Sequence, residues 1–236
     1  KSGNLRIKNY LSANNENVIE EIKSQIDLSK PTLLYTPTFE NKLLSSYKEY
    51  SSIKFFIQLF NSLKTPSYFN WIIKVHPNVE SNNPQLWGSL VSLKEEYCKK
   101  GVNIILEAYQ EYLPFMEVAD ALISDRTTAA FDFLYFNKPI FFLDNTNECP
   151  LKIDFDKDIM NSFWLYQAGT VIRKKDLLNT DCILQSFTNE DSHKEIREKC
   201  KKFSFEDKRT ALDIINKLSS YHSSKFSKSC QKLTVS

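Results

Sequence analysis

The sequence predicts an α/β fold built on one doubly wound parallel sheet, with helices on both of its faces. Two observations support this prediction: short, uniformly apolar runs alternate along the chain with segments whose apolar residues recur at helical spacing. A parallel strand covered on both faces is apolar throughout, whereas a half-exposed strand alternates. The expected strands are residues 31–36, 70–75, 102–106, 121–123 and 138–143.

Helical spacing of apolar residues predicts the elements between these strands. In the first helix the apolar positions are Val18, Ile19, Ile22 and Ile26. Gly101 is expected to end the helix before the third strand, because glycine tolerates the left-handed conformation at a helix C-terminus. The expected helices are residues 15–28, 53–63, 86–100, 112–118, a helix after the fourth strand, 191–202 and 206–219.

The segment 145–170 and the order of the strands are less well determined by the sequence than the strands and helices above. The aromatic-rich segment 145–170 is expected to form a loop packed over the sheet edge, since long ordered loops are usually packed by their own side chains. The order of the strands in the sheet does not follow from the sequence.

The composition is that of an ordinary globular protein, with 236 residues, 42% hydrophobic and 25% charged. A net charge of +2 gives no argument for nucleic-acid binding. A membrane-spanning helix needs about 18 consecutive apolar residues, and no apolar run in the sequence is that long. No signal peptide is visible. Because the chain begins with Lys1 and not with Met, we expect it to be a fragment or a processed form.

The residue types that build metal and cofactor sites are scarce or scattered. Five cysteines without a CxxC pair favour reduced thiols in a cytosolic protein over disulfides or a zinc site. No two histidines have the spacing of a helical metal motif, and four glycines cannot supply a Walker loop or GxGxxG. We therefore expect no metal and no cofactor.

The segment 119–133 is the most informative part of the chain. It predicts a buried strand, a hydroxyl-rich turn and a helix start, with Ser124, Asp125, Thr127 and Thr128 as capping residue types. The N–H groups and the positive end of such a helix can bind an anion. The same turn is equally compatible with capping residues that bind only their own backbone.

Two further strand ends carry polar residues. Thr36 and Thr38 follow the first strand, and His76, followed by Pro77, ends the second. Because the carboxyl ends of parallel strands share one edge, we expect these residues to meet the turn after the fourth strand. At a strand end, His76 can donate a hydrogen bond to phosphate or act as an acid near neutral pH. His193 and His222 are expected on polar helical surfaces.

Several short motifs occur in a fixed order along residues 1–220. They are Gly3-Asn4-Leu5-Arg6, Leu34-Tyr35-Thr36-Pro37-Thr38-Phe39, Lys74-Val75-His76-Pro77, the segment 124–132 with Lys138-Pro139-Ile140, and Phe205-Glu206-Asp207. This series resembles the CDP-glycerol glycerophosphotransferases of teichoic acid and capsule synthesis. The resemblance implies the second half of a GT-B-like architecture: an interdomain segment at 1–14, a Rossmann-like donor-binding domain at 15–220 and a flexible tail at 221–236.

The resemblance also implies a role for each candidate residue. His76 would be catalytic and would stabilise negative charge as CMP leaves. Asp132 would face the ribose or brace the loop; a helix-surface carboxylate is an equal alternative. Arg126 stands where the family has Tyr, and we expect it to supply positive charge to phosphate. Tyr109 would form a wall for the base, and Thr127 and Thr128 would hold the pyrophosphate. The donor-binding residues implied are Thr36, Thr38, Tyr109, Ser124, Asp125, Arg126, Thr127, Thr128 and Asp132.

The activity implied is transfer of a glycerol-phosphate or other polyol-phosphate unit from a CDP-linked donor, the substrate, to a cell-surface polymer or lipid-linked acceptor. The acceptor would bind an N-terminal domain outside this chain, so we expect the fragment to be inactive alone. It would be cytoplasmic, and peripheral at the inner face of the bacterial cell membrane through that outside part. The alternatives are a GT-B glycosyltransferase or epimerase that uses a nucleotide-sugar, and a catalytically silent interaction domain.

Overall fold

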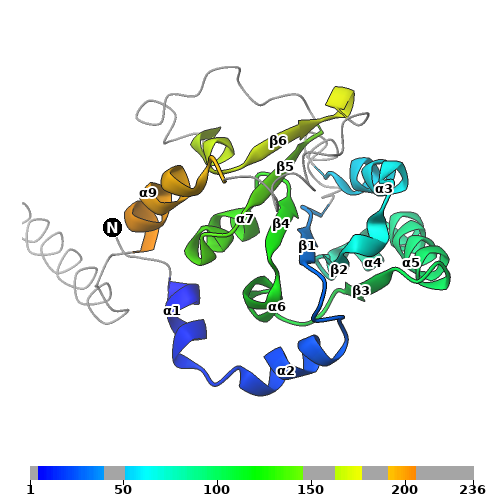
Figure 1. Ribbon diagram of the computed structural model, residues 1–236, viewed down its shortest axis with the longest axis horizontal. Helices are drawn as coiled ribbons and strands as arrows, with labels where there is room; N and C mark the ends of the chain where they lie inside the picture. Colours follow the sequence, from blue (N-terminus) through cyan, green and yellow to red (C-terminus); the bar gives the residue numbers. More distant parts are fainter. Residues whose placement is uncertain (1–4, 40–50, 146–162, 177–190, 206–236) are drawn as a thin grey trace, which may run out of the picture.

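A six-stranded sheet in the order β3-β2-β1-β4-β5-β6 forms the centre of the computed structural model (Figure 1). All five strand pairs are parallel. The structure describes residues 5–39, 51–145, 163–176 and 191–205. The strands are β1 (Thr32–Thr36), β2 (Asn70–Lys74), β3 (Asn103–Glu107), β4 (Ala121–Ser124), β5 (Ile140–Asp144) and β6 (Thr170–Arg173). The strand order reverses between β1 and β4, which confirms the predicted doubly wound sheet.

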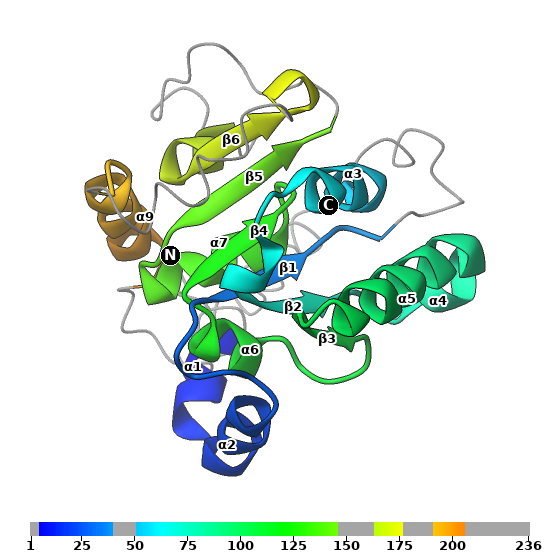
Figure 2. The same ribbon diagram turned by 45° about the vertical axis from the view of Figure 1, so that its right-hand side comes forward.

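Helices cover both faces of this sheet (Figures 1 and 2). On one face lie α3 (Ile53–Ser62), α4 (Asn78–Asn82) and α5 (Pro84–Lys99). On the other face lie α1 (Leu5–Ser12), α2 (Glu16–Ser24), α6 (Leu113–Val118), α7 (Thr128–Phe133) and α9 (Lys194–Phe205). Short 3-10 helices span Pro66–Tyr68, Leu134–Phe136, Phe163–Ala168 and Lys174–Asp176.

The central strands β1, β2, β4 and β5 are buried on both faces, and their successive residues belong to opposite cores. In β1, Tyr35 belongs to the core under α3 and α5, where its ring stacks on Phe56 at a centroid distance of 3.7 Å. Its neighbour Leu34 belongs to the core under α6 and α7. All five residues of β1 are buried, as the continuous apolar run predicts.

Most predicted elements have the expected type, with ends displaced by a few residues. The predicted helix 15–28 ends at Ser24, and Gly101 follows α5 with a left-handed φ of 78°. The predicted loop 145–170 is wrong at its end, since it contains a 3-10 helix and the first residue of β6. That helix does pack over the sheet through Leu165 and Tyr166. The predicted helix 206–219, the tail and His222 lie outside the described residues.

The N-terminal helix α1 packs on the same core as the sheet, because Ile7 and Tyr10 are buried there. The domain boundaries at residues 14 and 220 stay predictions. Cys98 and Cys200 are free thiols; the other cysteines lie outside the described residues. Across the described part of the chain, no helix has both the length and the apolar composition that spanning a bilayer requires.

Candidate functional site

A cavity of about 570 Å³ opens at the carboxyl ends of β1, β2 and β4. Its wall is completed by the loop after β3, the first turn of α7 and one residue of α1. This is the edge where the strand order reverses, and doubly wound sheets commonly bind ligands there. The volume lies within the range of about 300–1,000 Å³ of small-molecule sites.

Most of the predicted site residues line this cavity. They are Thr36, Thr38, His76, Tyr109, Arg126, Thr127 and Thr128. The remaining predicted residues, Ser124, Asp125 and Asp132, are buried and are not part of the cavity wall. The sequence therefore predicted which strand ends converge, but it did not separate residues that face the cavity from residues that support its wall.

His76 lines the cavity as a neutral imidazole with one donor. Its Nδ1 accepts a hydrogen bond from the backbone N–H of Asn78 at 3.1 Å, so the ring proton is on Nε2. Burial lowers the pKa of His76, and the positive charge of Lys74 lowers it further. The ring also stacks on Phe39 at a centroid distance of 4.4 Å. Such an imidazole can donate Nε2–H to an anionic oxygen.

Lys74 also lines the cavity, although it was not among the predicted site residues. The side chain is buried, and its Nζ donates to the carbonyl oxygens of Val75 at 3.1 Å and Ala108 at 2.9 Å. These bonds join the loops after β2 and β3. Desolvation lowers the pKa of the Lys74 ammonium, against the opposing effect of nearby Glu107 and Glu111. A basic residue two positions before His-Pro at a strand end was the available signal.

The turn after β4 caps the helix that follows it, as predicted. Thr127 is the N-cap of α7, and its Oγ1 accepts from the N–H of Ala130 at 3.2 Å. Ser124 Oγ donates to the carbonyl oxygen of Thr36 at 2.6 Å and lies 3.1 Å from Thr127 Oγ1. Thr128 is exposed at the cavity wall. Capping is therefore the role that the structure shows for Thr127.

Asp125 lies behind the wall and joins three segments. Its Oδ2 accepts from the backbone N–H of Thr38 at 2.7 Å and of Ser52 at 3.3 Å. Its Oδ1 has no hydrogen-bond partner among the described residues. Burial raises the pKa of Asp125 to about 7, against the lowering effect of its hydrogen bonds. The carboxyl group thus holds the loop after β1 and the start of α3 against the turn after β4.

Asp132 is not a surface carboxylate, so that alternative is wrong: only 1% of the residue is exposed. Tyr112 donates its hydroxyl to Asp132 Oδ2 at 2.5 Å, and Arg6 Nη1 lies 3.6 Å from the same oxygen. Both partners line the cavity, and neither was among the predicted site residues. The only signal was the position of Arg6 in the first motif of the series.

Tyr109 and Arg126 lie at the cavity wall, whereas His193 does not. Tyr109 stands at the cavity wall with 72% of its surface exposed, and its hydroxyl donates to the Glu80 carboxylate. The Arg126 guanidinium lies 6.0 Å from the centre of the Tyr166 ring. His193 is not part of the cavity wall, and its Nδ1 lies 3.0 Å from the carbonyl oxygen of Gln167. His193 directly precedes α9 and is half-buried, so its expected position on a polar helical surface is wrong.

Residues 1–219 match the family described as CDP-Glycerol:Poly(glycerophosphate) glycerophosphotransferase. No curated protein matches the chain. Among solved structures, the wall teichoic acid polymerase TagF is 17% identical with a TM-score of 0.47, over 94% of this chain and 49% of that chain. The chain thus spans about half the length of the TagF structure.

Two other solved structures are similar. UDP-GlcNAc 2-epimerase from Neisseria meningitidis bound to UDP-GlcNAc is 19% identical with a TM-score of 0.49, over 85% of this chain and 48% of that chain. A glycosyltransferase from Rickettsia africae ESF-5 is 13% identical with a TM-score of 0.59, over 94% of this chain and 55% of that chain. The last comparison shows that this fold also occurs in a glycosyltransferase.

Proposed function

Because this chain belongs to the CDP-glycerol:poly(glycerophosphate) glycerophosphotransferase family, we propose that it binds the CDP-linked donor of a transferase. The donor carries a glycerol-phosphate or other polyol-phosphate unit, and the acceptor is a cell-surface polymer bound by another part of the whole protein. In this proposal the chain is the second half of a GT-B-like architecture. The whole enzyme works at the inner face of the cell membrane, where such acceptors are anchored.

One observation carries the proposal: cations and hydrogen-bond donors from two strand ends and from α1 converge on one cavity. Of the charged side chains in the described wall, three are basic (Arg6, Lys74 and Arg126) and one is acidic (Glu111). The neutral imidazole of His76 and the hydroxyl of Thr128 add donors. A diphosphate, with its concentrated negative charge and several acceptor oxygens, is the ligand chemistry that fits this wall best.

The proposed reaction follows from this placement. An acceptor hydroxyl oxygen attacks the phosphorus of the polyol-phosphate unit, and the bond from that phosphorus to the bridging oxygen breaks. CMP leaves with the bonding electrons, and the acceptor proton goes to a base outside this chain. His76 Nε2–H meets the negative charge that grows on the leaving oxygen, as donors in an oxyanion hole do. Arg126 and Thr128 hold the diphosphate at the start of α7.

Titration calorimetry of the 236-residue chain with CDP-glycerol, CDP, UDP and GDP tests the proposal. We expect the cytidine compounds to bind most tightly, with or without added Mg²⁺. Tighter binding of UDP would overturn the cytidine assignment and favour a nucleotide-sugar enzyme. Absence of binding to any of these nucleotides would favour a silent interaction domain.

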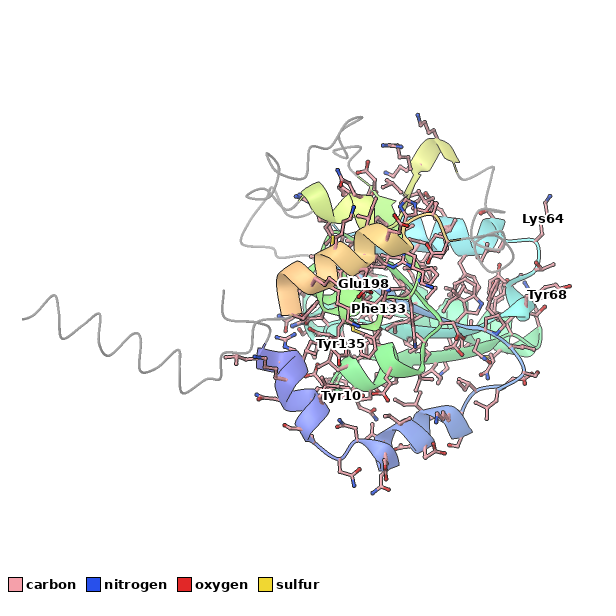
Figure 3. The ribbon with its side chains drawn as sticks, turned by 60° about the vertical axis from the view of Figure 1, so that its left-hand side comes forward. Tyr10, Lys64, Tyr68, Phe133, Tyr135 and Glu198 are labelled. Carbon is pink, nitrogen blue, oxygen red and sulfur yellow. The ribbon has the colours of Figure 1, made fainter. Side chains whose placement is uncertain are left out.

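A matched pair of variants tests where the cytosine ring binds. Tyr109→Ala should weaken CDP binding, because a ring at the cavity wall can stack on cytosine. Tyr68→Ala is the control, since Tyr68 is similarly exposed, at 65%, and is not part of the cavity wall (Figure 3). Equal affinities of the two variants for CDP would remove Tyr109 from the site.

A further inference from the structure

Three side chains from different helical segments meet at one side of the cavity. Arg6 comes from α1, Tyr112 directly precedes α6, and Asp132 lies in α7. Arg6 Nη1 donates to the Tyr112 hydroxyl oxygen, and that hydroxyl donates to Asp132 Oδ2 at 2.5 Å. The guanidinium also lies over the Tyr112 ring, 5.3 Å from its centre. These contacts connect a buried carboxylate to a cation in the cavity wall.

The exposed fractions of these three side chains indicate which of them is fixed and which faces the ligand. Asp132 is 1% exposed, and a buried carboxylate is stable only when it is paired and hydrogen-bonded. Burial raises the pKa of the Tyr112 phenol, and the hydrogen bond to Asp132 raises it further, so Tyr112 keeps its proton and stays a donor. Arg6 is the outermost member, with half of its side-chain surface exposed.

Attachment of α1 to the domain does not depend on Arg6 alone. Ile7 and Tyr10 are buried in the core, and the Tyr10 hydroxyl donates to Glu117 Oε2 on α6 at 2.6 Å. Figure 3 labels Tyr10 on α1. Arg6 and Tyr112 line the cavity, whereas Tyr10 does not. The position of Arg6 is therefore better explained by the cavity than by helix packing.

The same contacts place Arg6 beside the turn that we propose holds the diphosphate. Thr128 and Asp132 are four residues apart on α7, so they lie on the same side of that helix, one turn from each other. A guanidinium held against Asp132 is thus one turn away from Thr128. Both Arg6 and Thr128 line the cavity.

We propose that Arg6 is a donor-binding residue that contacts the phosphate oxygens of the diphosphate, and that Tyr112 and Asp132 are its positioning residues. This inference rests on the proposed function, since it requires a diphosphate in the cavity. A planar guanidinium matches phosphate oxygens, and a side chain already held in place loses less conformational entropy on binding. Asp132 then acts through Tyr112 and Arg6, without touching the ribose.

The test uses inorganic pyrophosphate, CDP-glycerol and cytidine as probes of the 236-residue chain. Arg6→Met should weaken the affinity for pyrophosphate and for CDP-glycerol by about tenfold, the scale of one hydrogen bond to a charged group. The affinity for cytidine, which has no phosphate, should not change. An Arg6→Met chain with wild-type affinity for both diphosphate compounds would overturn the inference.

Tyr112→Phe tests positioning, because it removes the hydroxyl and keeps the ring. It should weaken binding of the two diphosphate compounds by about threefold, less than Arg6→Met, because the Arg6 side chain remains and loses only its hydrogen bond to the hydroxyl. The double variant Arg6→Met with Tyr112→Phe should bind them no more weakly than Arg6→Met alone. Full additivity of the two effects would contradict positioning through Arg6, since a purely structural role of Tyr112 would persist without that side chain.

Two control variants separate binding from helix packing and from net charge. Tyr10→Phe removes the hydrogen bond from α1 to Glu117 without touching the cavity wall, and Lys23→Met makes the same charge change on α2. Neither should change the affinity for pyrophosphate. A loss with Tyr10→Phe as large as that with Arg6→Met would mean that Arg6 only docks α1. An equal loss with Lys23→Met would mean that only net charge matters.

Failure of the proposed function gives a different result from failure of this inference. If the wild type prefers UDP over CDP, the cytidine assignment falls, while the effect of Arg6→Met on pyrophosphate still supports the inference. If the wild type binds neither pyrophosphate nor any nucleotide diphosphate, both proposals are overturned.

Discussion

The neutral state of His76 is set by its surroundings and defines what this residue can do. The N–H of Asn78 faces Nδ1, so protonation there would bring two hydrogen atoms together. Burial and Lys74 lower the pKa of His76 below its ordinary 6.5. Protonation of Nδ1 would cost the hydrogen bond from Asn78, so any loss of function from His76 protonation should have its midpoint below pH 6.5.

His76→Ala in the whole enzyme should reduce transfer by roughly two to four orders of magnitude, the usual value of a lost charge-stabilising group. Donor affinity should fall far less, because the proposed contacts at the start of α7 and at Tyr109 remain. His76→Gln, whose amide N–H can replace Nε2–H, should retain more activity than His76→Ala. Near-normal turnover of His76→Ala would leave His76 as a structural residue ahead of Pro77.

The two threonines at the start of α7 should respond differently to substitution by alanine. Thr127→Ala removes the N-cap and should lower the free energy of unfolding by about 1 kcal/mol. Thr128→Ala should weaken CDP-glycerol binding by about 1–2 kcal/mol and leave stability nearly unchanged. Denaturant unfolding and calorimetry of both variants check this. Unchanged nucleotide affinity in both would mean that the turn is only a cap.

Among the elements, the link made by Asp125 between β1, β4 and α3 gives a pH-dependent stability. The folded pKa of Asp125 is about 7, compared with 3.8 in the unfolded chain. Between these values the folded state holds a proton that the unfolded state has lost, so stability falls as pH rises. The shift corresponds to roughly 4 kcal/mol across this range.

Asp125→Asn cannot ionise and should remove this contribution. The difference in unfolding free energy between variant and wild type should therefore move in favour of the variant from pH 5 to pH 8. Urea unfolding at both pH values measures it. Identical pH dependence in the two proteins would contradict a raised pKa at Asp125.

The contact between β5 and β6 depends on Gly169, directly before β6. A Cβ atom there would lie 2.2 Å from the carbonyl oxygen of Ile140, which is backbone and cannot move aside cheaply. Gly169→Ala should therefore destabilise the protein by about 1–3 kcal/mol or more. Gly88→Ala, in the exposed middle of α5 with no atom within 4 Å, should stabilise it by up to about 1 kcal/mol. Equal melting temperatures of the two variants would contradict this explanation of the β5–β6 contact.

Across the whole molecule, the features that could be predicted from the sequence are those that local residue patterns determine, such as the positions of the strands. Buried strands such as β1 contain a continuous apolar run, so their positions and the shared carboxyl edge follow from the sequence. The order of the strands does not follow, because it depends on packing between segments far apart in the chain. The edge strand β6 was missed because three of its four residues are only half-buried, so its apolar signal is weak.

The parts of the site that escaped prediction are those made by distant contacts. Arg6 and Tyr112 are 106 residues apart, and no local pattern indicates that they meet. The burial of Lys74 depends on the carbonyl oxygen of Ala108 in another loop. The role of Asp132 stayed undecided because its helix position fits a surface residue as well as a buried one.

A crystal structure of the chain with CDP-glycerol is the most direct test of the central claim. We predict the diphosphate at the start of α7, in contact with Thr128, Arg126 and Arg6, and His76 Nε2 within hydrogen-bonding distance of a phosphate oxygen. The cytosine should lie against Tyr109. A donor bound away from the carboxyl edge of the sheet, or a diphosphate that touches neither His76 nor the first turn of α7, would contradict the proposed site.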